Sequence, residues 1–170
     1  MDYQDIYLHV TSPETVFLAE EHNRVLAMAS YNSVVLSGIP SLIVEGIAIE
    51  PETQGKGIFA KMTDVARDRE YAVCLRTQNP RMYRALQKYC SLIYPNEREI
   101  PSAITEIRTA LAESMGCKIN ERGVVGGYYG GLFYGEEPIH PKVTSFFKEE
   151  LELNLERGDA LLCIGLGRSK

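Results

Sequence analysis

The 170-residue chain has no excess of basic residues and no long apolar run. It carries 18 Lys and Arg against 23 Asp and Glu, which gives a formal net charge of −5, and no basic cluster stands out. Nucleic acids and anionic membranes attract proteins through Lys and Arg, so this balance argues against either as the main partner. No apolar stretch approaches membrane-spanning length, so no membrane segment is expected.

Leader and metal-binding patterns are also missing from the sequence. The first residues, Met1 to Asp5, contain no cationic region before an apolar run, so no signal peptide is expected. The 4 cysteines are scattered without a C-x-x-C pair, and the 3 histidines show no metal spacing. We therefore expect no metal site, and we expect reduced, mostly buried thiols in a cytoplasmic protein.

A strand, a glycine turn and a helix follow one another between residues 42 and 69. Leu42–Ile49 is largely apolar and rich in β-branched residues, which predicts a buried strand. Pro51 ends it, since proline cannot donate to a sheet ladder. Two glycines then allow a tight turn over 54–57, and from Ile58 apolar residues recur three or four apart, which predicts an amphipathic helix. This arrangement suits a phosphate, because free N–H groups at a helix N-terminus and the helix dipole favour an anion.

The glycine spacing excludes two common phosphate loops. A Walker loop needs two glycines five apart followed by Lys and Ser or Thr, which Gly57 and its successors do not supply. The dinucleotide fingerprint fails because Ala60 stands at its third glycine. The segment instead resembles the acyl-CoA loop of the GNAT N-acetyltransferase family, Q/R-x-x-G-x-G/A after a strand that ends in A-V-x-P. Here Ala48–Pro51 matches the strand end and Gln54–Phe59 matches the loop, with Phe59 where the family usually has Gly or Ala.

A second segment strengthens the resemblance. Ala72–Arg76 predicts another short buried strand, and Asn79 and Pro80 are a favourable N-cap and first-turn residue for a following helix. GNAT proteins have a comparable strand–Asn–helix element after the phosphate helix. The resemblance implies that Asn79 hydrogen-bonds the pantetheine arm and that a helix tyrosine is the general acid, for which Tyr83 is the candidate chosen and Tyr89 the other one. The alternative for Tyr83 is a core tyrosine. The resemblance further implies that acetyl-CoA, the co-substrate, contacts Ile47, Ala48, Ile49, Gln54, Gly55, Lys56, Gly57, Ile58 and Phe59.

The segments before the glycine turn predict three consecutive antiparallel strands. Two apolar segments, 16–19 and 24–35, flank a short polar turn and indicate a hairpin, and a second turn at 37–41 leads into the strand at Leu42. The start, residues 6–15, is either a shortened helical region or a first strand, and we favour the shortened region. The expected fold is α/β (α+β): a mixed, mostly antiparallel central sheet with helices on both faces, as in GNAT proteins.

The second half of the chain resembles the family less closely. We expect a helix that Ser102 caps, a helix that begins at His140-Pro141, and a last strand over residues 160–166. The glycine- and aromatic-rich segment 123–135 predicts either a bulged strand or a flexible loop over a ligand, in which Tyr128, Tyr129 and Tyr134 line an acceptor pocket. No repeat or linker divides the chain, so we expect one domain over residues 1–170, with 101–170 its less typical part.

Glu45 and Gly46 are the candidates for chemistry within the central strand. A strand glycine suits a β-bulge, which in GNAT proteins exposes a backbone N–H to the thioester carbonyl; the alternative is a glycine under a large side chain. An unpaired carboxylate among Leu, Ile and Val would be costly, so Glu45 is either a general base or the partner of an arginine.

The expected activity is acetyl transfer from acetyl-CoA to an amine, directly and in a ternary complex. The acceptor is expected to be a small molecule, and homodimerisation is possible because it is common in the family. One alternative is an acyl-CoA sensor or interaction module on the same fold, without turnover. Another is a nucleotide-phosphate protein of a different fold.

Overall fold

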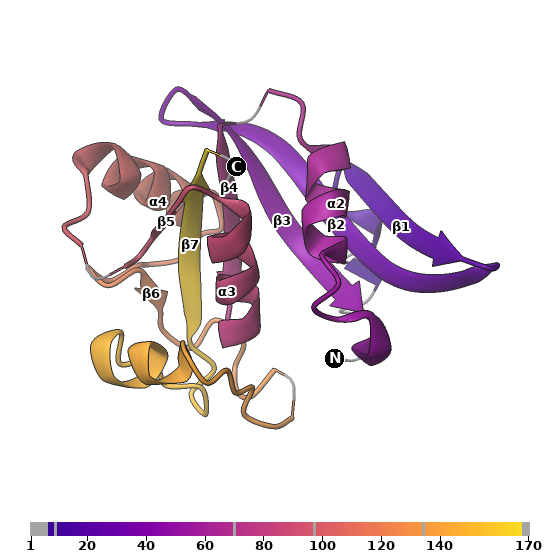
Figure 1. The fold of residues 1–170 in the computed structure, drawn as a ribbon. Helices are drawn as coiled ribbons and strands as arrows, with labels where there is room; N and C mark the ends of the chain where they lie inside the picture. Colours follow the sequence, from indigo (N-terminus) through magenta and orange to yellow (C-terminus); the bar gives the residue numbers. More distant parts are fainter. Residues whose placement is uncertain (1–6, 9, 70, 97, 134, 168–170) are drawn as a thin grey trace.

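One seven-stranded sheet runs through the molecule, with helices against both of its faces (Figure 1). This computed structural model describes residues 7–8, 10–69, 71–96, 98–133 and 135–167. The strand order is β1-β2-β3-β4-β7-β5, with β6 beside β7, and every pair is antiparallel except β3 with β4. The strands are β1 (Thr15–Glu21), β2 (Arg24–Leu36), β3 (Ile39–Ile49), β4 (Ala72–Thr77), β5 (Leu92–Tyr94), β6 (Val124–Val125) and β7 (Ala160–Leu166). The expected mixed, mostly antiparallel sheet is confirmed.

The helices lie in the connections between these strands. They are α2 (Ile58–Ala66), α3 (Pro80–Tyr89), α4 (Ser102–Ser114), the 3-10 turn η1 (Pro51–Thr53) and the π-helical turn η2 (Phe146–Glu150). At the start of α3, Asn79 caps the helix as predicted, because its side chain accepts a hydrogen bond from the backbone N–H of Arg81. Ser102 does not cap α4, since Pro101 holds the cap position and no side-chain bond is made there.

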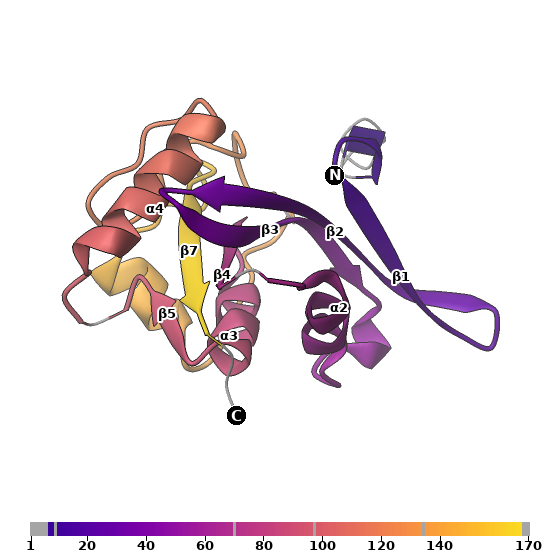
Figure 2. The same ribbon diagram turned by 90° about the horizontal axis from the view of Figure 1, so that it is seen from above.

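Two hydrophobic cores form because the strands present alternate residues to opposite faces of the sheet. In β4, Val73 and Leu75 belong to the core beneath α2 and α3, whereas Ala72 and Cys74 belong to the core beneath α4. Figure 2 shows this arrangement, with α4 on one side of the sheet and α2 and α3 on the other. Helices on both faces were expected, and this expectation is confirmed.

The three strands before the glycine turn form two hairpins, as predicted. The β1–β2 turn places His22 and Asn23 at φ 49° and 61°, and the β2–β3 turn places Ser37 and Gly38 at φ 48° and 78°. Positive φ at both central residues gives the turn a twist that matches the twist of its strands. Towards the turn that joins them, β1 and β2 extend away from the rest of the sheet (Figure 1).

Several expectations outside the central segment were wrong. This does not apply to the start of the chain: residues 7–8 and 10–11 are helical, which agrees with the favoured shortened helical region and excludes the alternative of a first strand there. The helix expected from His140 is only residues 144–145 before it widens into η2, where the N–H of Leu151 bonds the carbonyl of Phe146. Of residues 123–135, only β6 is strand and the rest of the described part forms turns.

None of the described helices is long and apolar enough to cross a bilayer.

Candidate functional site

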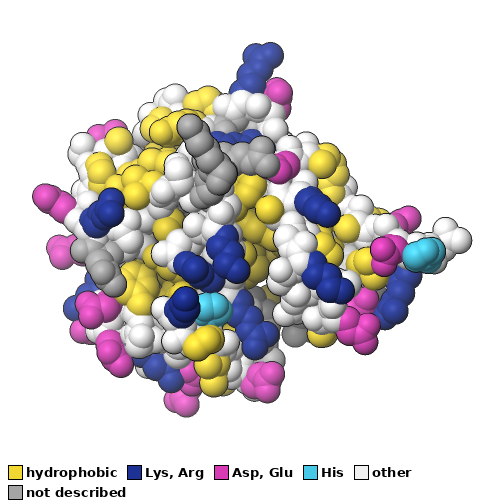
Figure 3. All heavy atoms as spheres, viewed as in Figure 1, with side chains coloured by type: hydrophobic (Ala, Val, Ile, Leu, Met, Phe, Trp, Pro, Cys, Tyr) yellow, Lys and Arg dark blue, Asp and Glu magenta, His cyan; other side chains and the backbone are white. Residues whose placement is uncertain are grey.

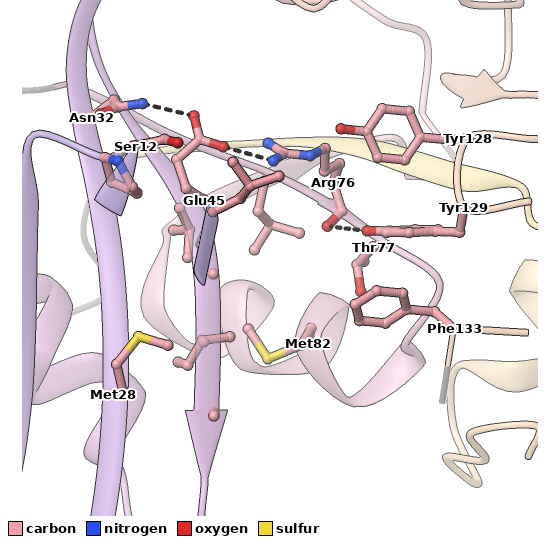
Figure 4. A pocket seen from close by; sticks show the side chains of 17 residues that line it. Ser12, Met28, Asn32, Glu45, Arg76, Thr77, Met82, Tyr128, Tyr129 and Phe133 are labelled. Carbon is pink, nitrogen blue, oxygen red and sulfur yellow. Dashed lines mark hydrogen bonds and ion pairs between the residues drawn. The ribbon is translucent and has the colours of Figure 1, made fainter. Parts of the chain in front are cut away.

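β3 and β4 separate from one another halfway along their length. They pair only over Ser41–Val44 and Ala72–Leu75, which is the one parallel pairing among the described strands. Past that point a cavity of about 760 Å³ opens between them (Figure 4). Gly46, Ile47 and Ala48 line it. These residues pair with β2 on one side, and on the other side, where β4 has turned away, they border the cavity.

A β-bulge lies at the point where the strands separate. Ser30 of β2 pairs with Gly46, and the next residue, Tyr31, pairs with Val44. Glu45 is therefore the extra residue of β3 and has no partner in the ladder. The bulge expected around Gly46 is confirmed, and it turns the side chain of Glu45 into the cavity.

Glu45 is held by two side chains from the neighbouring strands (Figure 4). Its Oε2 lies 2.7 Å from Nη2 of Arg76 on β4, and its Oε1 accepts a 2.9 Å hydrogen bond from Nδ2 of Asn32 on β2. The Glu45 and Arg76 side chains are only 18% and 14% exposed. The arginine partner considered for Glu45 therefore exists. Sequence reasoning missed Arg76 and Asn32 because each sits in a strand pattern with nothing local to mark it.

The guanidinium of Arg76 is the positive charge of the cavity. Burial alone would lower the pKa of Arg76, but the Glu45 carboxylate and then the hydroxyl groups of Tyr128 and Tyr129 raise it above its usual value. The guanidinium carbon also lies 5.6 Å from the centre of the Tyr128 ring, within reach of a cation–π contact. Arg76 therefore remains charged across the physiological pH range.

Three aromatic rings close one side of the cavity. Tyr128 and Tyr129 meet edge to face with ring centres 5.0 Å apart, and Tyr129 and Phe133 lie 4.8 Å apart. The hydroxyl of Tyr129 donates to the carbonyl of Arg76 at 3.2 Å. The expectation that Tyr128 and Tyr129 line this pocket is confirmed, whereas Tyr134 lies outside the described residues.

The buried amide of Gln78 fixes the aromatic segment to the end of β4. Its side chain is fully buried; Nε2 donates to the carbonyl of Gly131 at 2.9 Å, and Oε1 accepts from the N–H of Phe133 at 2.9 Å. Because the turns around these residues lack ladder partners, this side chain supplies the hydrogen bonds that a strand would have made. Sequence analysis overlooked Gln78, although a polar residue directly after a buried strand is a signal for such a role.

The glycine turn lies between η1 and the start of α2, and its residues are not among the described residues that line the cavity. Gly55 and Gly57 take φ 79° and 77°, the left-handed conformation in which glycine is favoured. The first intrahelical bond of α2 runs from the N–H of Lys61 to the carbonyl of Gly57 at 3.1 Å, so the amides of Ile58 to Ala60 precede it. The Phe59 side chain is buried, 5% exposed, in the core; only its backbone is placed for a ligand.

The face of the molecule that carries this turn is rich in basic residues, although the chain as a whole is acidic. In Figure 3, which has the same view as Figure 1, Lys and Arg side chains gather over the region of α2 and α3. The basic residues of the turn and of these two helices are Lys56, Lys61, Arg81, Arg84 and Lys88. A local excess of positive charge beside free helix amides favours a multiply charged phosphate ligand.

Three further residues were predicted to act on acetyl-CoA, and each makes a hydrogen bond to the backbone. Gln54 donates from Nε2 to the carbonyl of Ile49 at 3.0 Å, which fastens the glycine turn to the end of β3. Asn79 uses its Oδ1 to cap α3, so its side-chain amide nitrogen is the group left to face a ligand. Tyr83 is 3% exposed, does not line the cavity, and donates its hydroxyl to the carbonyl of Pro95 at 2.6 Å. That position fits the core alternative for Tyr83 better than the expected general acid.

Comparisons with known proteins find similar solved structures but no match by sequence. No protein-family model matches the sequence, and no curated protein does. Solved structures do match: an IAA acetyltransferase from Bacillus cereus ATCC 14579 aligns with a TM-score of 0.50 and 15% identity, over 97% of this chain and 85% of that one. A GNAT family acetyltransferase from Elizabethkingia anophelis, solved with acetyl-CoA bound, aligns with a TM-score of 0.44 and 16% identity, over 97% and 83% of the two chains. The ribosomal-protein-S18-alanine N-acetyltransferase from Escherichia coli aligns with a TM-score of 0.44 and 14% identity, over 100% and 80%.

The strand order, the separating parallel pair and the first of these alignments identify the fold as that of the GNAT acetyltransferases. At this level of sequence identity the likeness establishes the fold.

Proposed function

We propose that this chain is an N-acetyltransferase that moves the acetyl group of acetyl-CoA directly to an amine on a small molecule. The observation that carries the proposal is the separation of β3 from β4 at a bulge, on the strand that leads into the glycine turn of α2. A strand edge and a carboxylate lie at one cavity, and a helix terminus suited to a phosphate follows the same strand along the chain. Aromatic rings closing the cavity on one side favour a small acceptor over a protein.

In this proposal the donor spans both ends of the site. The N–H groups of Gln54 and Lys56 already donate to the carbonyls of Pro51 and Thr53, so the pyrophosphate binds the amides of Gly55 and of Gly57 to Phe59, with the Lys56 side chain adding positive charge. The pantetheine arm runs along Ile47–Ile49 as an added strand. Asn79 supplies a hydrogen bond to the arm from its side-chain nitrogen. The acetyl group then reaches the bulge, where the carboxylate of Glu45 enters the cavity.

The transfer needs one proton acceptor and no covalent enzyme intermediate. Glu45 removes a proton from the acceptor ammonium, and the neutral nitrogen attacks the thioester carbonyl to form the C–N bond. The C–S bond then breaks, and the second proton that the nitrogen loses passes to the departing thiolate, which gives the acetylated amine and the CoA thiol. No cysteine is among the described residues that line the cavity. Burial raises the pKa of Cys74 to about 12, so the thiol on the neighbouring strand is not a thiolate at neutral pH.

One observation favours the alternative, an acyl-CoA-binding module without turnover. Both oxygens of Glu45 already accept a hydrogen bond from a neighbouring side chain, as a structural carboxylate would. Each carboxylate oxygen has a second lone pair, so an ammonium can still approach. The two functions differ in thiol release: a transferase releases CoA thiol when an amine is supplied, whereas a sensor binds acetyl-CoA and releases none.

The experiment that tests donor binding is the substitution Gly57→Glu, with Gly38→Glu as its matched control. Gly57 and Gly38 have φ 77° and 78°, and at neither glycine does any atom lie within 4 Å of the position that a Cβ would occupy. Each substitution therefore costs the same backbone strain, about 1–2 kcal/mol. Gly57→Glu alone adds a negative charge at the pyrophosphate, and two like charges about 5 Å apart repel by about 3 kcal/mol.

Calorimetry with acetyl-CoA reads out the difference. Gly57→Glu should weaken binding by about 100-fold or more, while Gly38→Glu should bind as the unmodified protein does, with a similar loss of thermal stability. If the two variants bind acetyl-CoA equally well, the glycine turn is not the phosphate site and the proposed function falls.

A further inference from the structure

The described residues that line the cavity have a net charge of zero. Among the described residues that line it, Glu45 and Arg76 are the only ones with a full charge, and they lie 2.7 Å apart. Both side chains are mostly buried, so a third charge placed beside them would lack a counter-ion in a region of low dielectric. A simple alkylammonium would add such a charge. A zwitterion, with one ammonium and one carboxylate, would not.

The guanidinium of Arg76 has donors to spare for a second carboxylate. Within the described chain, the carboxylate of Glu45 is its one hydrogen-bond acceptor, through Nη2, and the Tyr128 ring covers its face. A guanidinium carries five N–H donors in a fixed fork, which suits two-point binding of a carboxylate.

We propose that the acceptor is an α-amino acid, whose carboxylate binds Arg76 while its ammonium binds Glu45. This inference rests on the proposed function and specifies its substrate class. The two charged groups of an α-amino acid sit on the same carbon, so they reach an adjacent carboxylate and guanidinium together. Glu45 then takes the proton that the ammonium must lose, and the N-acetyl product keeps its carboxylate on Arg76.

The aromatic wall, formed by Tyr128, Tyr129 and Phe133, indicates which amino acids fit. These rings bound the cavity beyond Arg76 and are held in place by the buried Gln78. A side chain that extends from the α-carbon towards these rings meets apolar surface and ring edges. The acceptor is therefore an amino acid with an apolar or aromatic side chain, such as phenylalanine, leucine or methionine.

The test compares L-phenylalanine with phenethylamine, the same molecule with hydrogen in place of the carboxylate. Binding of each is measured by calorimetry in the presence of saturating CoA, and thiol release is measured with acetyl-CoA. L-Phenylalanine should bind and react at least about 10-fold better, because a charged two-point contact is lost with the carboxylate. Leucine and methionine extend the comparison with their own decarboxylated amines.

Arg76→Lys gives the matched variant, since it keeps the positive charge opposite Glu45 and removes the fork. Its affinity for L-phenylalanine should fall about 10-fold more than its affinity for phenethylamine, so that the preference for the amino acid is lost. Equal affinity of the unmodified protein for amino acid and amine, or no binding of any apolar amino acid, would overturn the inference. If the unmodified protein does not bind acetyl-CoA at all, the proposed function is refuted instead. The two failures can therefore be told apart.

Discussion

The buried amide of Gln78 gives the sharpest test of how the aromatic wall is held. Gln78→Leu keeps most of the side-chain volume and removes both polar atoms. The carbonyl of Gly131 and the N–H of Phe133 each lose a partner at 2.9 Å, and a weaker contact to the carbonyl of Leu155 at 3.4 Å is lost as well. These backbone groups belong to half-buried residues, so water replaces the lost bonds only in part.

The expected cost follows from the number of orphaned groups. A buried backbone donor or acceptor without a partner costs about 1–3 kcal/mol, and because these two groups are half-buried we take the low end, which gives about 2 kcal/mol for the pair. In a domain of this size, each kcal/mol lowers the melting temperature by about 2–4 °C. We therefore expect Gln78→Leu to lower the melting temperature by about 4–8 °C.

Urea unfolding with Gln87→Leu as control measures this effect. Gln87 lies on the exposed face of α3, so the same change of residue type there should stay within about 0.5 kcal/mol. Because the aromatic wall bounds the acceptor part of the cavity, Gln78→Leu should also raise the KM for the acceptor and leave the acetyl-CoA affinity unchanged. A Gln78→Leu protein as stable as the Gln87→Leu control would refute the role assigned to this side chain.

Three further predictions address the remaining polar groups. Glu45→Gln should lower kcat by about 100-fold and leave the calorimetric Kd for acetyl-CoA unchanged, and parallel losses in both would make Glu45 structural. Tyr83→Phe should leave kcat unchanged and cost about 1–2 kcal/mol of stability by orphaning the Pro95 carbonyl, whereas a tenfold fall in kcat would make Tyr83 the general acid after all. Burial alone would raise the pKa of Asp159, but Arg157 and two backbone amides lower it. That stabilisation is present above the unfolded pKa of about 3.9 and is lost as the pH falls through the folded value, so the deficit of Asp159→Asn in urea unfolding should shrink below about pH 4; a deficit that does not change with pH would contradict it.

The local patterns that the sequence displays were enough for the central segment. Leu42–Ile49 forms a strand because its apolar, β-branched residues fit a buried pleat, and Gly57 precedes α2 because the turn requires positive φ. Asn79 caps α3 by accepting from the amide of Arg81, a contact that spans two residues. Each of these features depends on interactions within a few positions of the chain, which a sequence lays out directly.

The second half of the chain was predicted less well because its structure depends on distant partners. The pattern of segment 123–135 is equally compatible with strand and loop, and the choice is made by Gln78, whose side chain bonds Phe133 across a separation of 55 positions. The helix expected from His140 gives way to η2, in which the N–H of Leu151 bonds five residues back instead of four. Neither outcome has a local signature.

By itself, the sequence determined the order of strands and helices around the glycine turn and the presence of a carboxylate in the central strand, because periodicity, proline, glycine and capping residues act over short range. Only the tertiary structure decided what that carboxylate faces. The bulge puts Glu45 between Asn32 from β2 and Arg76 from β4, residues 13 and 31 positions away along the chain. The sheet brings the three together because β3 pairs with both neighbouring strands, and no pattern within one strand specifies which side chains its neighbours will contribute.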